Sequence, residues 1–156
     1  MQKFTCTKTY DNIPIGHRQP NHSGHCSRIH GHDWAFTFTF GCEERDPVTG
    51  FVMDFGDLKD LKASIEKFDH ALALNKTDAA MVFLLREMHG SGFVQSDYFK
   101  IVWVDDCTCE GFAEYFHQVA SNIVSEKTSG RVWVESVVVH EGRVNSATYS
   151  CTGDCL

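Results

Sequence analysis

Hydrophobic and polar residues alternate strictly over residues 35–40, which read Ala-Phe-Thr-Phe-Thr-Phe. A period of two is that of a β-strand with one buried face, so this segment is predicted to be a strand. Weaker alternation over residues 3–10 predicts a second strand that can pair with the first as a hairpin. Residues 11–33 have little apolar periodicity, and they are therefore predicted to form a long loop.

Apolar residues at helical spacing predict two helices, each with one buried face. The first ends near residues 69–70, and its inner face is formed by Leu58, Leu61, Ile65 and Phe68. The second can be capped by Thr108 and closed by Gly130. Its inner face is formed by Phe112, Phe116, Val119 and Ile123. Residues 78–88 predict a further helix, which is followed by a Gly-rich turn at 90–92.

Short apolar and β-branched runs predict the remaining strands. A turn at residues 46–50 leads into a short strand at 51–55. The other runs cover residues 99–104, 131–139 and 144–149. Together these elements predict one domain over residues 1–156, of the α+β class, in which helices pack on one face of an antiparallel sheet.

Composition narrows the functional classes. With 156 residues and 42% hydrophobic content, the chain can bury a single core. A formal net charge of −7 argues against general binding to nucleic acids or anionic membranes, because both require a positive field. The sequence contains no signal-peptide pattern and no apolar stretch of membrane length, so a soluble, cytoplasmic protein is expected. The seven cysteines are an odd number and several lie near histidines, which predicts reduced thiols.

Five histidines lie between residues 17 and 32. His30 and His32 come directly before the strictly alternating strand, and histidines two residues apart can point to the same side and share one metal ion. A third imidazole from His17, His22 or His25 would give the three-ligand pattern of a catalytic zinc site, with one coordination position open.

Cys26 precedes this pair in the arrangement Cys-x-x-x-His-Gly-His. Its thiol could be a fourth ligand in a closed structural zinc site, and the chain would then be a zinc-binding module without chemistry. Alternatively, the thiol is unligated and lies beside the ion, whose charge would favour the thiolate as a base or nucleophile. The spacing alone does not separate these two alternatives.

Two acidic positions are further candidates. A carboxylate such as Asp69 can orient a neighbouring imidazole such as His70 and keep it ready to act as a general acid. Glu141 follows a run of valines, where a carboxylate at the end of a strand can bind a guanidine-like ring edge through two hydrogen bonds. In isolation each of these is more often a solvated polar residue at the end of a helix or strand than a functional one.

Six segments occur in an order that a known family shares. They are His-Arg-Gln-Pro at 17–20, Cys-Ser-Arg-Ile-His-Gly-His at 26–32, Thr-Gly-Phe-Val-Met-Asp-Phe at 49–55 with Leu-Lys at 58–59, Phe-Asp-His at 68–70, Thr-Cys-Glu at 108–110 and His-Glu at 140–141. Together they resemble the 6-pyruvoyltetrahydropterin synthase and 6-carboxytetrahydropterin synthase family across nearly the whole chain. The resemblance implies the tunnelling fold (T-fold), in which subunits close their sheets into a barrel as trimers that usually pair into hexamers.

The resemblance also implies a role for each matching residue. The zinc ligands are His17, His30 and His32, which selects His17 from the three candidates for the third imidazole. Cys26 is the catalytic thiol. Asp69 and His70 are a proton-relay pair, which is commonly supplied by a neighbouring subunit. The pterin pocket is formed by Thr108, Cys109, Glu110 and Glu141, the last of which anchors the amino-pyrimidine edge.

The implied substrate is 7,8-dihydroneopterin triphosphate. The Cys-x-x-x-His-Gly-His spacing looks like that of the carboxy-forming enzyme of queuosine and 7-deazaguanine synthesis, which releases triphosphate and acetaldehyde. The alternative is the pyruvoyl-forming enzyme of biopterin-type pathways, in which the cysteine lies about two residues farther from the histidine pair.

The sequence also departs from the family pattern at several places. Cys107 stands where a proline often precedes Thr108, and residues 71–100 are longer than in compact members. The tail that contains Cys151 and Cys155 has no counterpart in the family, and free thiols are expected there rather than a metal site.

Overall fold

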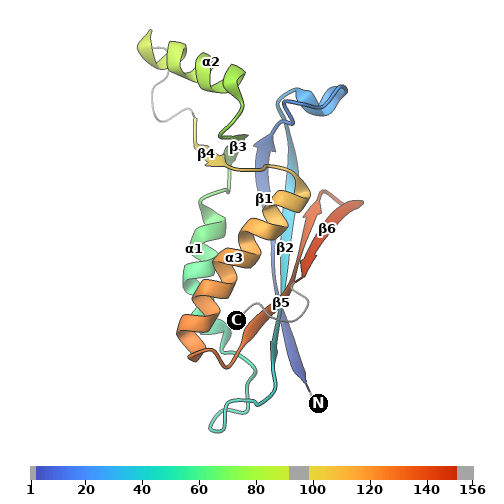
Figure 1. Cartoon of the computed structure of the whole chain (residues 1–156), viewed down its shortest axis with the longest axis vertical. Helices are drawn as coiled ribbons and strands as arrows, with labels where there is room; N and C mark the ends of the chain where they lie inside the picture. The colour runs from blue at the N-terminus through green and yellow to red at the C-terminus, as the bar shows by residue number, and fades with distance from the viewer. Residues whose placement is uncertain (1–2, 92–98, 151–156) are drawn as a thin grey trace.

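The computed structural model describes residues 3–91 and 99–150 (Figure 1). A six-stranded sheet runs the length of the molecule, and two helices, α1 and α3, lie against one of its faces. The helices are α1 (Lys59–Glu66), α2 (Ala79–Gly90) and α3 (Cys109–Thr128), with short 3-10 helices η1 (His25–Ser27) and η2 (Phe55–Leu58). The strands are β1 (Phe4–His17), β2 (His30–Cys42), β3 (Ala71–Asn75), β4 (Ile101–Val104), β5 (Trp133–Glu141) and β6 (Asn145–Ser150).

The strands lie in the order β4-β3-β1-β2-β5-β6. Four of them, β1, β2, β5 and β6, pair antiparallel, as predicted. However, β3 pairs parallel with β1, and β4 pairs parallel with β3. The α+β class is therefore confirmed, but the sheet is mixed rather than antiparallel throughout. The difference arises from β3, which was not predicted, and from the crossover containing α2 that a parallel β3–β4 pair requires.

The β1–β2 hairpin is longer than its hydrophobic alternation predicts. β1 continues to His17 and β2 begins at His30, so the predicted loop over 11–33 is wrong at both ends and the connection spans residues 18–29. A bulge between Tyr10 and Ile13 shifts the register, and Asn12 there has a positive φ of 56°. The extra residue breaks the period of two, which hides the second half of the strand from pattern analysis.

The predicted strand at residues 51–55 is wrong. Phe51 and Phe55 are 52% and 45% exposed, so the apolar run does not lie in the sheet. It leads instead into η2, where the Asp54 carboxylate accepts a hydrogen bond of 2.8 Å from the Gly56 amide.

The predicted helices are confirmed. α1 buries Leu61 and Ile65, and α2 lies close to the range expected for it. The Thr108 hydroxyl accepts a hydrogen bond of 2.9 Å from the Gly111 amide and so caps α3. Ser129 and Gly130 adopt the left-handed conformation that ends it. The predicted strands at 99–104, 131–139 and 144–149 correspond to β4, β5 and β6, whereas the Gly-rich turn at 90–92 lies partly outside the described residues.

The core lies between the sheet and α3. Trp34 and Phe36 of β2 are fully buried and meet Phe112 and Phe116 of α3, with ring centroids 5.0 and 4.7 Å apart. Because side chains two residues apart on a strand share a face, this aromatic row continues into His32 and His30 at the start of β2. The core packing therefore fixes the side of the sheet on which the histidines stand. Within residues 3–91 and 99–150, none of the helices combines the length and hydropathy needed to cross a bilayer.

Candidate active site

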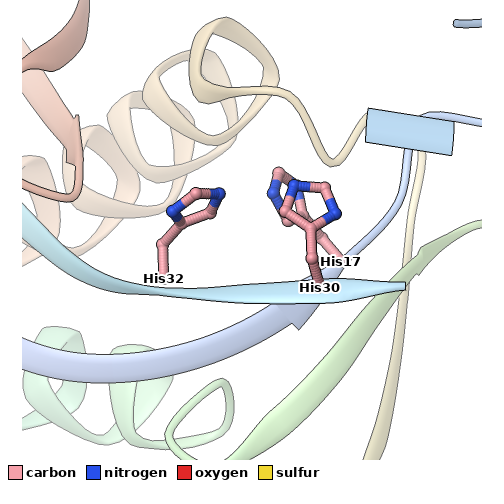
Figure 2. A group of neighbouring side chains, drawn as sticks. All are labelled: His17, His30 and His32. Atoms are coloured by element: carbon pink, nitrogen blue, oxygen red, sulfur yellow. The ribbon is translucent and has the colours of Figure 1, made fainter. Parts of the chain in front are cut away.

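Three imidazoles meet at one end of the β1–β2 hairpin (Figure 2). His17 is the last residue of β1 and pairs directly with His30, the first residue of β2. His32 follows two residues later on the same face. One nitrogen atom from each of the three rings lies within 4.8 Å of those of the other two. The residues predicted as metal ligands are thus brought together by the register of a single hairpin.

Backbone carbonyls fix two of the three rings. His17 Nδ1 lies 2.9 Å from the carbonyl oxygen of Cys107, and His30 Nδ1 lies 2.7 Å from that of Arg28. A carbonyl can only accept, so Nδ1 carries the proton in both rings. The lone pair of Nε2 is then free in both, which is the arrangement that a metal-binding histidine needs.

A zinc ion fits this group. The side chain of His17 is 3% exposed, and its Nε2 has no hydrogen-bond partner among the residues that the structure describes. A buried polar atom without a partner is costly unless a ligand satisfies it. Burial lowers the pKa of His17, outweighing the opposing effect of the Cys107 hydrogen bond, so the ring favours the neutral form that binds metals. Three nitrogen donors suit zinc and leave a fourth position open.

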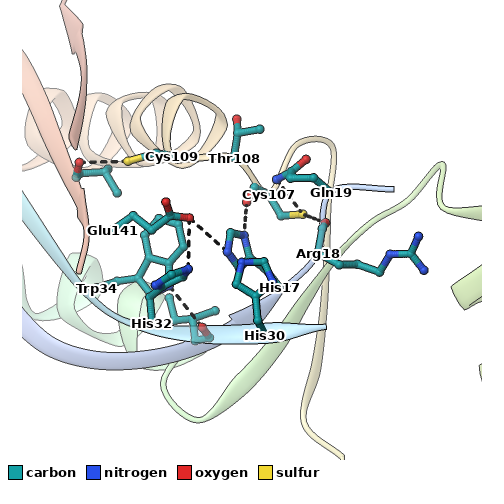
Figure 3. Close-up of polar contacts among 12 residues, drawn as sticks. His17, Arg18, Gln19, His30, His32, Trp34, Cys107, Thr108, Cys109 and Glu141 are labelled. Atoms are coloured by element: carbon teal, nitrogen blue, oxygen red, sulfur yellow. Dashed lines mark hydrogen bonds and ion pairs between the residues drawn. The ribbon is translucent and has the colours of Figure 1, made fainter. Parts of the chain in front are cut away.

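The carboxylate of Glu141 faces the same imidazoles (Figure 3). Its Oε1 lies 3.1 Å from His17 Nε2 and 3.7 Å from His32 Nε2. Glu141 is the last residue of β5 and pairs with Trp34, whose indole forms the buried floor beneath the histidines. The sequence predicted Glu141 as a pterin anchor and gave no sign that it would also border the metal ligands.

A cavity of about 230 Å³ opens beside His17 and His30. It lies between the 18–29 connection, the start of α3 and the turn from β5 to β6. The predicted site residues that line it are Cys26, Thr108, Cys109, Glu110 and Glu141. Gln19, Asn145 and Ser146 also line it and were not predicted, because isolated polar residues in a connection or at a strand end form no sequence pattern.

Three cysteines lie in this region, and their environments differ. The thiols of Cys107 and Cys109 each donate to a backbone carbonyl at 3.1 Å, that of Arg18 and that of Val139 respectively. Burial raises the pKa of both thiols, that of Cys109 to about 11, so both stay protonated. Cys26 is only partly buried, borders the cavity, and forms no side-chain hydrogen bond within the described part of the chain. Of these thiols, that of Cys26 is the one free for chemistry.

Asp69 and His70 contact one another but do not line this cavity. Their side chains form a hydrogen bond of 2.7 Å between His70 Nδ1 and Asp69 Oδ1, and the His70 side chain is 80% exposed. His70 also has a positive φ of 55°, which is uncommon for a residue other than glycine. It lines a second, more open hollow, which His32 also borders. Asp69 and His70 are therefore in contact with one another, but neither lines the cavity that Cys26 borders.

Comparison with known proteins agrees with these findings. Residues 5–151 match the family model described as 6-pyruvoyl tetrahydropterin synthase. The chain belongs to this family. The 6-carboxy-5,6,7,8-tetrahydropterin synthase of Rickettsia conorii is 36% identical to this chain over 78 residues. That match covers 49% of this chain and 55% of the relative, so it spans about half of each protein.

Solved structures of the pterin synthase family share the fold. The 6-pyruvoyl tetrahydropterin synthase of Caenorhabditis elegans gives a TM-score of 0.64 at 18% identity, over 97% of this chain and 98% of that one. That of Plasmodium vivax gives 0.66 at 15% identity, over 96% and 98%. An uncharacterized protein from Wolinella succinogenes gives 0.81 at 19% identity, over 96% and 99%. At these identities the similarity establishes the fold, and the predicted T-fold is confirmed for the single subunit.

Proposed function

We propose that this pterin synthase family member is a zinc-dependent 6-carboxy-5,6,7,8-tetrahydropterin synthase. It converts 7,8-dihydroneopterin triphosphate to 6-carboxytetrahydropterin and releases triphosphate and acetaldehyde. The observation that carries this proposal is the group formed by His17, His30 and His32. It borders a cavity that is also lined by Cys26, whose thiol forms no hydrogen bond with the described residues. The half-length similarity to a carboxy-forming relative supports this product over the pyruvoyl compound.

His17, His30 and His32 would hold the zinc ion, which when bound would supply Lewis acidity to the reaction. Cys26, as thiolate, removes a proton from the side-chain carbon next to the pterin ring. His70, oriented by Asp69, delivers a proton from the opposite side.

Glu141 accepts hydrogen bonds from the amino-pyrimidine edge, because a carboxylate matches two parallel N–H donors. Thr108, Cys109 and Glu110 line the same cavity and complete the pterin pocket.

The separation of the Asp69–His70 pair from Cys26 supports an active site built between subunits. In this arrangement a second copy of the chain places its Asp69 and His70 over the cavity of the first. Trimers that pair into hexamers are the assembly we expect for this family fold.

The thiol can be tested by replacing Cys26 with alanine. The Cys26→Ala variant should retain stoichiometric zinc and lose turnover of dihydroneopterin triphosphate by a factor of at least about 100, the lower range for a general base. The readouts are zinc content and product identification by mass spectrometry. A Cys6→Ala variant, which alters a thiol in the hairpin away from the cavity, is the matched control and should keep wild-type activity.

Three other results of these measurements would contradict part or all of the proposal. Loss of zinc from Cys26→Ala would make this thiol a fourth ligand and the chain a structural zinc module. Pyruvoyltetrahydropterin without acetaldehyde from the wild-type protein would identify the pyruvoyl-forming branch. No turnover by the wild-type protein would contradict the enzymatic proposal.

A further inference from the structure

The amide, carbonyl and thiol of Cys107 all form hydrogen bonds, at the point where the ends of β1 and β3 meet the start of α3 (Figure 3). It is fully buried and lies directly before the cap of α3. Its amide donates to Asn75 Oδ1 at 2.9 Å, and its carbonyl accepts from His17 Nδ1 at the same distance. Its thiol donates to the Arg18 carbonyl at 3.1 Å and lies 3.8 Å from the Gln19 amide nitrogen.

The thiol and the carbonyl of Cys107 act on adjacent residues. The carbonyl fixes the ring of His17, while the thiol fixes the backbone immediately after it, at Arg18. These two hydrogen bonds tie the side chain of His17 and the backbone that follows it to the same residue. Without the thiol, the strand end could move relative to the carbonyl, and the free Nε2 would lose its aim at His30 and His32.

The segment between β3 and α2 supports the same junction. Asn75, the last residue of β3, holds the Cys107 amide. Asp78 caps α2 by accepting from the Met81 amide at 3.2 Å, and its other carboxylate oxygen lies 3.4 Å from Arg18 Nε. Its side chain is only 2% exposed, so its charge relies on this pairing. Cys107 and Arg18 are therefore both held by residues that lie shortly before α2.

We propose that Cys107 is a positioning residue for the metal ligand His17, and that its thiol sets the affinity of the three-histidine group for zinc. This inference rests on the proposed zinc site. It separates Cys107 from Cys26 in role: one thiol orients a ligand and remains buried, and the other stands in the cavity. A proline at position 107 could supply the carbonyl but neither the amide bond nor the thiol bond, so this chain holds His17 by contacts that proline would not provide.

The test is zinc affinity, measured by competition with a chromogenic chelator. Cys107→Ala should bind zinc about tenfold more weakly than the wild type, the lower end of the range for partners of metal ligands, because the carbonyl itself remains. Cys107→Ser, whose hydroxyl can still donate to the Arg18 carbonyl, should recover affinity to within about threefold. Asn75→Ala, which frees the Cys107 amide, should weaken zinc in the same direction.

Cys42→Ala is the matched control, since Cys42 is also a fully buried thiol but lies in the core at the far end of β2. It should leave zinc affinity unchanged. Equal affinity of Cys107→Ala and wild type, or an equal loss in Cys42→Ala, would overturn the inference. A wild-type protein that binds no zinc, or a His17→Ala variant that keeps wild-type affinity, would instead contradict the proposed function. Should Cys107→Ala fail to fold, comparison of the serine variant and Asn75→Ala with Cys42→Ala decides.

Discussion

The two ring nitrogens of His17 have separate tasks in this fold. Nδ1 donates to a backbone carbonyl, and Nε2 is buried beside two further imidazoles and the Glu141 carboxylate, with no hydrogen-bond partner among the described residues. The sequence could predict which histidines come together, because the His-x-His pair and the family motifs mark them. It could not predict their supports, since these are carbonyl groups of Arg28 and Cys107, and every residue has a carbonyl.

Glu141 is the residue whose role depends most on geometry, because its carboxylate borders both the imidazoles and the cavity. Replacing it by alanine should weaken the binding of 7,8-dihydroneopterin by about 10- to 100-fold, the effect of losing hydrogen bonds to a charged group. Zinc affinity should change much less. Both can be measured on one preparation, by fluorescence titration with the pterin and by chelator competition for zinc.

If Glu141→Ala lost zinc as strongly as pterin, the carboxylate would be a fourth metal ligand rather than a ring anchor. If it changed neither, the pterin pocket would lie elsewhere.

At the level of elements, the parts with a clear period were predictable and the short or interrupted ones were not. The alternation at 35–40 and the apolar face of α3 are both confirmed. β3 was missed because its five residues, Ala-Leu-Ala-Leu-Asn, are largely buried and too short for their pattern to distinguish a strand from part of a helix. The second half of β1 was missed because a bulge interrupts its period. That half carries His17, so the least predictable strand end holds one of the three clustered histidines.

The contact between α3 and β5 includes a buried histidine that makes stability depend on pH. His117 is 5% exposed, and its Nε2 lies 3.0 Å from the Val134 carbonyl. Burial lowers the pKa of His117 in the folded state, and the hydrogen bond with the Val134 carbonyl has a smaller effect in the opposite direction. Above about pH 6.5, the pKa of this histidine in the unfolded chain, His117 is neutral in both the folded and the unfolded state, and its full contribution to stability is present. As pH falls below that value, the unfolded chain takes up the proton first, so stability is lost.

We therefore expect the free energy of unfolding to fall more steeply between pH 7 and pH 5 in the wild type than in His117→Gln. The difference in slope is at most about 1.4 kcal/mol per pH unit, the value for one proton. Urea unfolding of zinc-free protein at a series of pH values measures both slopes. Parallel curves would show that His117 titrates in the folded state as it does in the unfolded chain.

At the level of the whole molecule, no helix among residues 3–91 and 99–150 packs on the second face of the sheet, and its two edge strands have no outer neighbour within those residues. Thr7 and Thr9 of β1 pair with Thr39 and Thr37 of β2, and strand alternation places Thr37 and Thr39 on the face opposite the aromatic row. β4 and β6 end the sheet, and within the described residues their outer edges pair with no further strand. Exposed edges of this kind invite pairing with another chain. The sequence indicated an assembly only through its family resemblance, because no residue pattern marks an edge.

An active site shared between subunits predicts complementation. Cys26→Ala and His70→Ala should each be inactive alone. Dissociated and reassembled as a mixture, they should recover up to roughly a quarter of wild-type activity, because random assembly brings an intact Cys26 and an intact His70 to that share of the sites. Turnover of dihydroneopterin triphosphate before and after mixing is the measurement. Absence of recovery in confirmed mixed oligomers would place both side chains in one subunit's site.

The central claim is that three imidazoles hold zinc while the nearby Cys26 sulfur stays unbound. X-ray absorption at the zinc edge of the zinc-loaded wild-type protein tests it most directly. The spectrum should contain only nitrogen and oxygen neighbours at about 2.0–2.1 Å, with the imidazole scattering of three histidines. A sulfur neighbour at about 2.3 Å would contradict the claim, because the thiol would then be a ligand in a closed site and not a base.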